Sequence, residues 1–338
     1  MSYLNNKSIL ITGGTGSFGK KFIETALSKF KPKRLIVFSR DEQKQFNLQQ
    51  KWKEGGSSPM RYFIGDVRDV DRLILAMRDA DVVIHTAALK HVPAAEYNPF
   101  EAVKTNILGA QNVITASMAT NVKKVIALST DKASSSINLY GATKLTSDKL
   151  FIAANNFKGL KNIKFSVVRY GNVMASSGSV VPFFLNKKKE GIIPITDKRM
   201  TRFNITLQEA VNFVLFCLEK MWGGEIFVPK IPSYRLVDLV KATAPRNKIK
   251  IIGLSPGEKI HEEMISTSDA VNTIEYKKYF IITPYSKFIG WNKKKYMQLN
   301  KGGKVCKDDF SYNSKTNKEF LKPQQLQKLI KSHLSDFE

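Results

Sequence analysis

The stretch that decides the fold is residues 8–19, which read SILITGGTGSFG. A short β-branched run at residues 7–12 predicts a buried strand, and residues 17–29 predict an amphipathic helix. The glycines allow a tight turn, close approach of a pyrophosphate to the helix N-terminus, and close packing of the helix on the strand. The turn is therefore predicted to bind a dinucleotide through Gly13, Thr15, Gly16, Ser17, Phe18 and Gly19.

The same alternation of short apolar runs and longer amphipathic stretches continues through the first half of the chain. Further strands are predicted at residues 34–38, 61–64, 81–85, 123–128 and 164–168. Helices are predicted near residues 41–53, 69–78, 99–119 and 138–156. Runs that are apolar throughout are typical of parallel strands covered on both faces. The pattern predicts the α/β class, with a Rossmann-like, doubly wound parallel sheet.

Residues at the ends of the next strands indicate which dinucleotide binds. Arg40 follows the second strand, where an acidic side chain would hold a ribose hydroxyl and an arginine accommodates a 2′-phosphate. This favours NADP; Asp41 leaves NAD open, Lys44 could add positive charge, and Arg40 could instead be an ordinary surface residue. The remaining residues predicted to line the cofactor pocket are Ser39, Asp66, Val67, Ala87 and Ala88.

The rest of the chain is less regular. Helices are predicted at residues 178–190, 206–220 and 235–243, and strands at 225–228 and 249–252. We predict an NADP-binding Rossmann domain over residues 1–173, to which parts of 206–233 return. A smaller, interleaved α/β substrate domain is predicted from 174–205 and 234–290, followed by a basic C-terminal extension over 291–338.

Composition excludes several classes of protein. Of 338 residues, 43% are hydrophobic and 25% charged, as in globular proteins of about two domains. The two cysteines, Cys217 and Cys306, have no metal-ligand spacing, so neither a zinc site nor a disulfide scaffold is predicted. The N-terminus lacks a secretion signal and no apolar run is long enough to span a membrane, so a cytoplasmic protein is expected.

The chain is strongly basic, with a formal net charge of +25. Such a charge attracts polyanions, so a non-catalytic protein that binds nucleic acid or dinucleotides is one alternative. A lysine-rich solvated surface is the simpler interpretation, and nucleic acid is not predicted as a partner. The same positive field would also steer a nucleotide substrate to its site.

A second motif carries the chemistry. Tyr140 and Lys144 lie four positions apart in a predicted helix and therefore share one face. A lysine ammonium beside a phenol lowers the pKa of the phenol, so that Tyr140 could take a proton from a substrate alcohol. Thr130, Asp131 and Lys132 follow a predicted strand just upstream. With the glycine turn, this order and spacing resemble an extended short-chain dehydrogenase/reductase.

The resemblance narrows on longer motifs. They are TGGTGSFG (12–19), SRDE (39–42), IGDVRD (64–69), AALKHVP (87–93), KTN (104–106), STDK (129–132), NLYGATK (138–144) and RYGNV (169–173). Together they resemble the inverting UDP-N-acetylglucosamine 4,6-dehydratases of the soluble, pseudaminic-acid-pathway type. Retaining relatives have glutamate where this chain has Lys132.

The resemblance implies a mechanism. Tyr140 and NADP, tightly bound and regenerated in each turnover, would oxidise C4 of UDP-N-acetylglucosamine. Lys132, if neutral, would then remove the C5 proton, and Asp131, if protonated, would give its proton to the departing C6 hydroxyl. Burial is expected to favour the neutral form of both groups. Hydride returns to C6 and a proton reaches C5 from the opposite face, from Lys132 or from Tyr140.

The resemblance also implies binding residues. Lys90 and Val173 would contact the cofactor, along with Tyr140 and Lys144. Substrate contacts are implied for Lys90, Thr130, Asn172, Val181, Thr196, Arg202 and Glu258. Arg202 is the best candidate for the diphosphate, with a structural ion pair as the alternative.

Three sites depart from the family pattern. Ser177 and Ser255 stand where relatives usually have arginine, and Ser135-Ser136 replaces an Asn-Pro in the loop before Tyr140. A nucleotide-sugar 4-epimerase, or a retaining dehydratase, remains the alternative activity. A homo-oligomer is implied, and Ile107, Val113 and Ile114 either pair between subunits or pack in the core.

Overall fold

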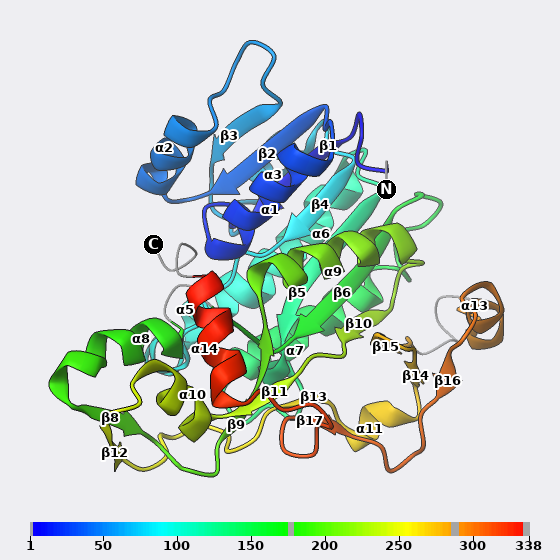
Figure 1. Ribbon diagram of the computed structural model, residues 1–338. Helices are drawn as coiled ribbons and strands as arrows, with labels where there is room; N and C mark the ends of the chain where they lie inside the picture. Colours follow the sequence, from blue (N-terminus) through cyan, green and yellow to red (C-terminus); the bar gives the residue numbers. More distant parts are fainter. Residues whose placement is uncertain (1–2, 175–178, 285–290, 334–338) are drawn as a thin grey trace.

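The computed structural model describes residues 3–174, 179–284 and 291–333. One large sheet organises the molecule, with strand order β16-β14-β15-β10-β6-β5-β4-β1-β2-β3 (Figure 1). Its parallel strands are β1 (Ser8–Thr12), β2 (Arg34–Ser39), β3 (Met60–Ile64), β4 (Val82–His85), β5 (Lys124–Thr130), β6 (Lys164–Tyr170) and β10 (Ile226–Pro229). The order 3-2-1-4-5-6 is that of a Rossmann fold, so the predicted fold class is confirmed.

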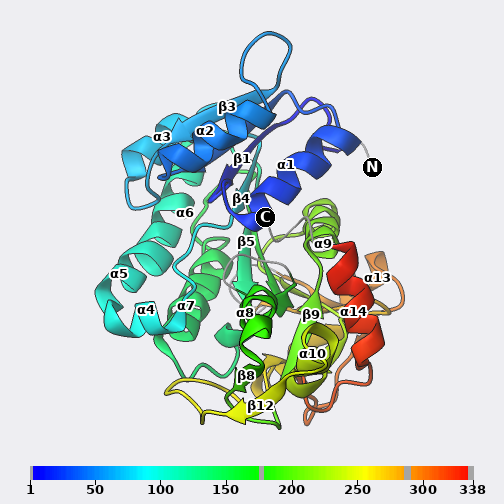
Figure 2. The same cartoon turned by 60° about the vertical axis from the view of Figure 1, so that its left-hand side comes forward.

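Helices cover both faces of this sheet. On one face, α1 (Ser17–Lys29) packs against α9 (Leu207–Lys220). On the other, α6 (Gly109–Ala119) packs against α3 (Val70–Met77) and α7 (Leu139–Ala153) (Figure 2). The helix α2 (Glu42–Lys51) contacts β2 and β3. Every residue of β1 is buried, which is why its sequence reads as a continuous apolar run.

The predicted helix over residues 99–119 is interrupted. It consists of α5 (Pro99–Val103), a π-helical turn (Lys104–Leu108) and α6. Inside the turn, the buried Asn106 side chain bonds both the N–H and the carbonyl of Leu89, at 2.8 and 2.9 Å. A short helix not predicted from the sequence, α4 (Val92–Tyr97), precedes it with a proline in its first turn. These features tie the loop after β4 to the helical layer.

The smaller part of the chain gathers at the carboxyl end of the large sheet. Its strands are β7 (Asn172–Val173), β8 (Ile192–Ile195), β9 (Thr201–Ile205), β11 (Ser233–Arg235), β12 (Lys248–Ile251), β13 (Glu263–Ile265) and β17 (Tyr312–Asn313). Its helices are α8 (Val180–Lys187), α10 (Leu236–Thr243), α11 (Thr267–Ala270) and α14 (Pro323–Ser332). Leu239 on α10 and Leu326 on α14 are fully buried in one apolar cluster.

Two segments belong to a different part of the fold from the one that the sequence predicted. They are residues 273–282, predicted in the substrate domain, and residues 291–333, predicted as a C-terminal extension. β14 (Thr273–Glu275) and β15 (Tyr279–Ile282) belong to the large sheet, where β15 runs antiparallel to β10. The predicted C-terminal extension is also integrated: β16 (Lys304–Val305) pairs with β14, while α13 (Lys293–Leu299) follows Trp291, whose indole donates to Gly223 O. Strands this short carry too few residues for their alternation to be read from sequence.

Two further expectations meet the structure here. Val113 and Ile114 are fully buried in the core of the chain itself, so the core interpretation holds for them rather than the subunit contact. Within the described residues, no helix is long and apolar enough to cross a membrane.

Candidate active site

The glycine turn has the geometry that its sequence predicts. Gly13 has a φ of 64°, which favours glycine, and a Cβ there would stand 2.9 Å from Ala87 N. A Cβ on Gly19 would meet Gly14 O at 2.2 Å, so the first turn of α1 packs directly on the loop. A Cβ on Gly16, the N-cap of α1, would meet only Gly13 O within 4 Å among the described residues, at 3.3 Å. The turn therefore leaves room for an anion at the helix N-terminus.

Beyond the turn, a cavity of about 150 Å³ opens at the carboxyl ends of β1, β2, β3 and β4. It is lined by Gly13, Phe38, Ser39, Arg40, Gly65, Asp66, Val67, Ala87, Ala88, Leu89 and Thr105. A Cβ on Gly65 would meet the Phe38 ring at 2.5 Å, so glycine allows that chain segment to pass close to the ring. Seven of the residues predicted for the cofactor thus surround one cavity at the switch point of the sheet, where ligands of such folds bind.

Charged groups near this cavity are paired with each other. Arg40 Nη1 lies 3.7 Å from Asp66 Oδ2, and Arg40 remains largely exposed. Asp41 caps α2 by accepting from Lys44 N at 2.9 Å, and Lys44 Nζ lies 3.0 Å from the same carboxylate. These hydrogen bonds lower the pKa of Asp41. Asp41 and Lys44 neutralise each other, which leaves Arg40 as the cation that lines the cavity.

Other predicted cofactor residues lie around the turn. Thr15 and Ser39, both buried, bond through their hydroxyls at 2.9 Å and so connect the turn to β2. Phe18 packs against the core, and Ser17 begins α1. Lys90 lies in the loop after β4, where burial lowers the pKa of its amine.

The residues predicted to be catalytic lie at the carboxyl end of β5. Thr130 ends the strand and its hydroxyl contacts Asp131 Oδ1 at 3.0 Å. Asp131 and Lys132 form a single 3₁₀ turn (Asp131–Ala133), and Lys132 Nζ lies 3.2 Å from the same carboxylate oxygen. Asp131 is fully buried, and its Oδ2 has no hydrogen-bond partner among the described residues. The structure thus brings together an unsatisfied acid and an amine.

A third charged group completes this cluster and was not predicted. Glu262, which immediately precedes β13, is buried, and its Oε1 lies 3.2 Å from Lys132 Nζ. The same atom lies 3.8 Å from Arg202 Nε. Glu262 is far from Lys132 in the chain and sits in a strand-like run with another glutamate, so no periodic signal distinguished it.

The protonation states in the cluster differ in part from the expectation. Burial raises the pKa of Asp131, as expected. For Lys132, burial lowers the pKa, but the carboxylates of Asp131 and Glu262 raise it further, so the net shift is upward. The expectation of a neutral Lys132 in the free protein is therefore wrong, because two carboxylates outweigh the loss of solvation.

Tyr140 and Lys144 lie on α7 beside this cluster, as predicted. The pKa of Tyr140, however, is raised and not lowered. Burial raises the pKa of Tyr140 to about 12, while Lys132 and Thr130 lower it. Tyr140 therefore keeps its proton in the free protein. Lys144 is 3% exposed, and burial lowers the pKa of its amine, against the opposing effect of Asp148. Burial and the Lys144 charge hold the pKa of the nearby His85 at about 3, so His85 is neutral.

Glycines allow α7 and the 3₁₀ turn at Asp131–Ala133 to pack closely against their neighbours. A Cβ on Gly141 would stand 2.2 Å from Lys132 O. A Cβ on Gly171 would meet Phe203 at 2.4 Å and Asp131 Oδ2 at 3.3 Å. Asn138 caps α7 by accepting from Gly141 N at 2.8 Å, and its amide donates to Gly257 O at the same distance. The cluster is thus enclosed between α7 and the segment leading to β13.

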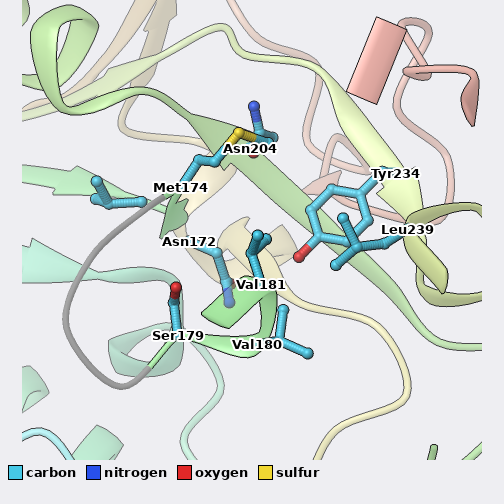
Figure 3. A pocket seen from close by; sticks show the side chains of 9 residues that line it. Asn172, Met174, Ser179, Val180, Val181, Asn204, Tyr234 and Leu239 are labelled. Carbon is cyan, nitrogen blue, oxygen red and sulfur yellow. The ribbon is translucent and has the colours of Figure 1, made fainter. Parts of the chain in front are cut away.

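A second pocket lies next to the cluster, within the smaller part of the chain, between β7, β9, β11, α8 and α10 (Figure 3). It is lined by Asn172, Val173, Met174, Ser179, Val180, Val181, Asn204, Tyr234 and Leu239. Asn172 Oδ1 is buried without a hydrogen-bond partner among the described residues. Figure 3 shows the hydroxyl end of Tyr234 directed toward Val181. Two predicted substrate residues, Asn172 and Val181, and one predicted cofactor residue, Val173, therefore share this pocket.

The remaining predicted substrate residues have partners of their own. The Arg202 guanidinium donates to the carbonyls of Thr201, Lys259 and Ile260, at 2.8 to 2.9 Å. Thr196 and Glu258 are 3.5 Å apart through their side-chain oxygens, and Glu258 accepts from Ser255 N. Ser177 lies outside the described residues. These contacts anchor the segment that carries Glu262, and the diphosphate contact of Arg202 stays a prediction.

Comparison with known proteins agrees with the geometry. Residues 9–284 match the family model described as "Polysaccharide biosynthesis protein". The chain belongs to this family. A relative from Campylobacter jejuni, "UDP-N-acetylglucosamine 4,6-dehydratase (inverting)", is 54% identical over 98% of this chain and 99% of its own length. The resemblance predicted from the sequence motifs is thereby confirmed.

More distant relatives and solved structures extend the comparison. A "UDP-glucose 4-epimerase" from Rickettsia canadensis is 41% identical over 82% of this chain and 83% of its own length. The X-ray structure of Pen from Bacillus thuringiensis has a TM-score of 0.88 at 40% identity, covering 98% of this chain and 99% of that chain. DesIV, a dTDP-glucose 4,6-dehydratase from Streptomyces venezuelae, has a TM-score of 0.66 at 19% identity over 75% of this chain and 86% of its own, and shows the shared fold.

Proposed function

We propose that this protein is a lyase, an NADP-dependent UDP-N-acetylglucosamine 4,6-dehydratase that inverts C5. The observation that carries the proposal is the buried Asp131, with an unpartnered Oδ2 among the described residues, held 3.2 Å from the Lys132 amine. An acid and a proton-exchanging amine side by side are what elimination of water across C5 and C6 requires. The 54% identical Campylobacter jejuni relative that bears this name supports it.

The chain's own residues divide the proton transfers. Tyr140 accepts the proton of the C4 hydroxyl, with Thr130 beside it. Asp131, whose pKa is raised by burial, carries the proton that leaves with the C6 oxygen as water. Lys132 exchanges the proton at C5, and because it is charged in the free protein it must first pass its own proton to a neighbouring carboxylate.

The residues present fit a nicotinamide dinucleotide. Gly13 and Gly16 would accommodate its pyrophosphate, and Ser39, Arg40, Asp66, Val67, Ala87 and Ala88 its adenosine. The bound dinucleotide would accept a hydride from C4 and return it to C6, and its positive charge would lower the pKa of Tyr140. Arg40 favours the 2′-phosphate of NADP over NAD.

The test is incubation of the purified protein with UDP-N-acetylglucosamine in deuterated water, followed by NMR. We expect a C6 methyl group, a ketone at C4, and deuterium at C5 with inverted configuration. A product that keeps the C6 hydroxyl would instead indicate a 4-epimerase, the activity named for the Rickettsia canadensis relative. No turnover, together with salt-sensitive binding of nucleic acid, would favour the polyanion-binding alternative.

We further infer a homo-oligomer, as the family resemblance implies. Tyr97 on α4 and Phe100 on α5 support it, because they are 87% and 61% exposed despite their large apolar rings. Light scattering on the purified protein gives the mass of the assembly, and a monomeric mass would contradict this inference.

A further inference from the structure

Glu262 is the second carboxylate beside Lys132, and the proposed reaction has assigned it no role. Glu262 is far from Lys132 in the sequence and immediately precedes β13. Its side chain is buried, and the residue is 2% exposed. Its Oε1 lies 3.2 Å from Lys132 Nζ, the same separation that joins Lys132 to Asp131. Its Oε2 has no hydrogen-bond partner among the described residues, so one oxygen is free to take a proton.

Neighbouring residues also hold the backbone of Glu262 in place. The backbone N–H of Glu262 donates to the buried Ser314 Oγ at 2.9 Å, and that hydroxyl contacts Thr201 Oγ1 at 2.7 Å. Arg202 lies 3.8 Å from Oε1 and is itself fixed by backbone carbonyls. A buried carboxylate costs several kcal/mol unless it is paired, and Lys132 and Arg202 are the cations that pair with this one.

The two carboxylates beside Lys132 cannot do the same work. Asp131 must carry a proton in order to release the C6 oxygen as water. It therefore cannot also receive the proton that Lys132 must lose before its amine can act on C5. Glu262 lies equally close to Lys132, and its Oε2 has no hydrogen-bond partner among the described residues.

We propose that Glu262 is a positioning and proton-holding residue, which clamps the Lys132 ammonium and accepts its proton when substrate is oxidised at C4. In this step a Lys132 N–H bond breaks and a Glu262 O–H bond forms. The neutral Lys132 amine then takes the C5 proton, and the C5 electron pair passes toward the C4 ketone. Elimination of the C6 hydroxyl with the Asp131 proton follows. This inference rests on the proposed dehydratase function.

The charged and titratable groups that face the pair come from several elements. Lys132 is faced by Asp131 on its own turn, Glu262 before β13, Arg202 on β9 and Tyr140 on α7. Glu262 is faced in addition by Lys259 in the preceding loop. Replacing Glu262 by an amide removes a negative charge beside Lys132, so the pKa of Lys132 must fall.

The decisive variant is Glu262→Gln, which keeps the shape of the side chain and removes its charge. At neutral pH we expect turnover to fall at least about 100-fold, with a much smaller change in KM. Oxidation at C4 should persist, so reduced cofactor accumulates in a single turnover. The residual rate should rise with pH, because solvent must now deprotonate Lys132, and the pH dependence assigned to Lys132 should lie at least about one pH unit lower than in the unmodified protein.

Matched variants separate this role from a structural one. Glu263→Gln changes the adjacent carboxylate, which bonds Ser135 rather than Lys132, and should leave turnover and pH profile unchanged. Glu262→Asp keeps the charge, so the pH profile should return toward that of the unmodified protein even if thermal stability falls. Should Glu262→Gln fail to fold, a Glu262→Asp variant with the full rate loss and the shifted profile would overturn the proposal.

A measurement without substrate distinguishes failure of the inference from failure of the proposed function. The Lys132 ammonium signal, followed by ¹⁵N NMR of the lysine side chains and assigned by its loss in Lys132→Met, should titrate at lower pH in Glu262→Gln. If the unmodified protein makes no 4-keto-6-deoxy product, the proposed function is wrong whatever this titration shows. If it does, and Glu262→Gln has an unaltered rate, profile and titration, Glu262 does not hold the proton.

Discussion

At the scale of single residues, Lys132 is defined by its neighbours more than by its own chemistry. Two carboxylate oxygens lie 3.2 Å from its amine, and both carboxylates are buried. Their attraction outweighs the effect of burial and raises the pKa of Lys132. A charge of this kind adds stability at all pH values below the unfolded pKa of lysine, and that stability is lost as pH rises through the folded pKa.

Removal of this amine should abolish the C5 step. Lys132→Met has a similar length and no ammonium, so we expect turnover to fall at least about 100-fold and no deuterium to enter C5. Product formation from UDP-N-acetylglucosamine in deuterated water, followed by NMR, measures both effects. Lys123→Met, which changes an exposed lysine just before β5, is the control and should behave as the unmodified protein. Unaltered labelling of C5 in Lys132→Met would contradict the assigned role.

A second residue, Arg40, should decide between the two dinucleotides. It lines the cavity at the end of β2 and its only near partner among the described residues is Asp66, at 3.7 Å. A hydrogen bond to a charged group contributes about 1.5–3 kcal/mol, so Arg40→Ser should weaken NADP binding roughly 10- to 150-fold and leave NAD binding nearly unchanged. Calorimetric titration with each dinucleotide measures the ratio, with Lys44→Ser, whose ammonium is paired with Asp41, as the comparison. Equal losses for both dinucleotides would show that Arg40 does not read the 2′-phosphate.

At the scale of elements, the site depends on how closely α7 approaches the 3₁₀ turn after β5. Gly141 is helical, and glycine in a helix is usually less stable than alanine by about 1 kcal/mol. Here a Cβ would stand 2.2 Å from Lys132 O, so the helix and the turn could not keep their present separation. The glycine is therefore required by packing between elements, although it weakens the helix.

Replacement of a helical glycine by alanine usually stabilises a helix, but Gly141→Ala should destabilise this protein. We expect stability to fall by about 1–3 kcal/mol and turnover to fall at least about tenfold, since the turn that carries Lys132 must shift. Urea unfolding and steady-state kinetics measure the two effects. In Ala142→Gly, the reverse change at the next, exposed position, stability should fall by about 1 kcal/mol with normal turnover. A more stable and fully active Gly141→Ala protein would exclude the packing argument.

At the scale of the whole molecule, the C-terminal segment completes the fold instead of extending from it. Leu326 on α14 is fully buried against residues of α8 and α10, and Ser314 supports the backbone of Glu262. β16 adds the last strand to the large sheet. The segment therefore contributes both to the apolar cluster of the smaller part of the chain and to the charge cluster of the site.

The contribution of this segment can be measured at Leu326. Leu326→Ala removes a fully buried side chain and should lower the free energy of unfolding by about 2–5 kcal/mol. Leu299→Ala, at a position that is 66% exposed at the end of α13, should change it by less than about 0.5 kcal/mol. Urea unfolding of both variants gives the comparison. Equal, small effects would mean that α14 is dispensable for stability.

The sequence by itself determined the doubly wound parallel sheet, the glycine turn and seven of the residues that line the cavity beyond it. Each of these depends on local patterns: a buried strand is apolar throughout, and a turn that admits a phosphate needs glycine. It also indicated Thr130, Asp131, Lys132 and Tyr140, because they follow a strand and share a helix at recognisable spacing. The interruption of residues 99–119 by a π-helical turn left no such signal, since a single extra residue does not disturb the apolar pattern.

Only the tertiary structure decided the electrostatics of the site. Asp131, together with Glu262 from a distant part of the chain, raises the pKa of Lys132 against the predicted direction. The Arg202 guanidinium donates hydrogen bonds to backbone carbonyls, and no pattern of side chains in the sequence predicts such bonds. The physical reason is that burial and Coulomb interactions depend on distances between atoms in space, and residues remote in sequence set those distances once the chain has folded.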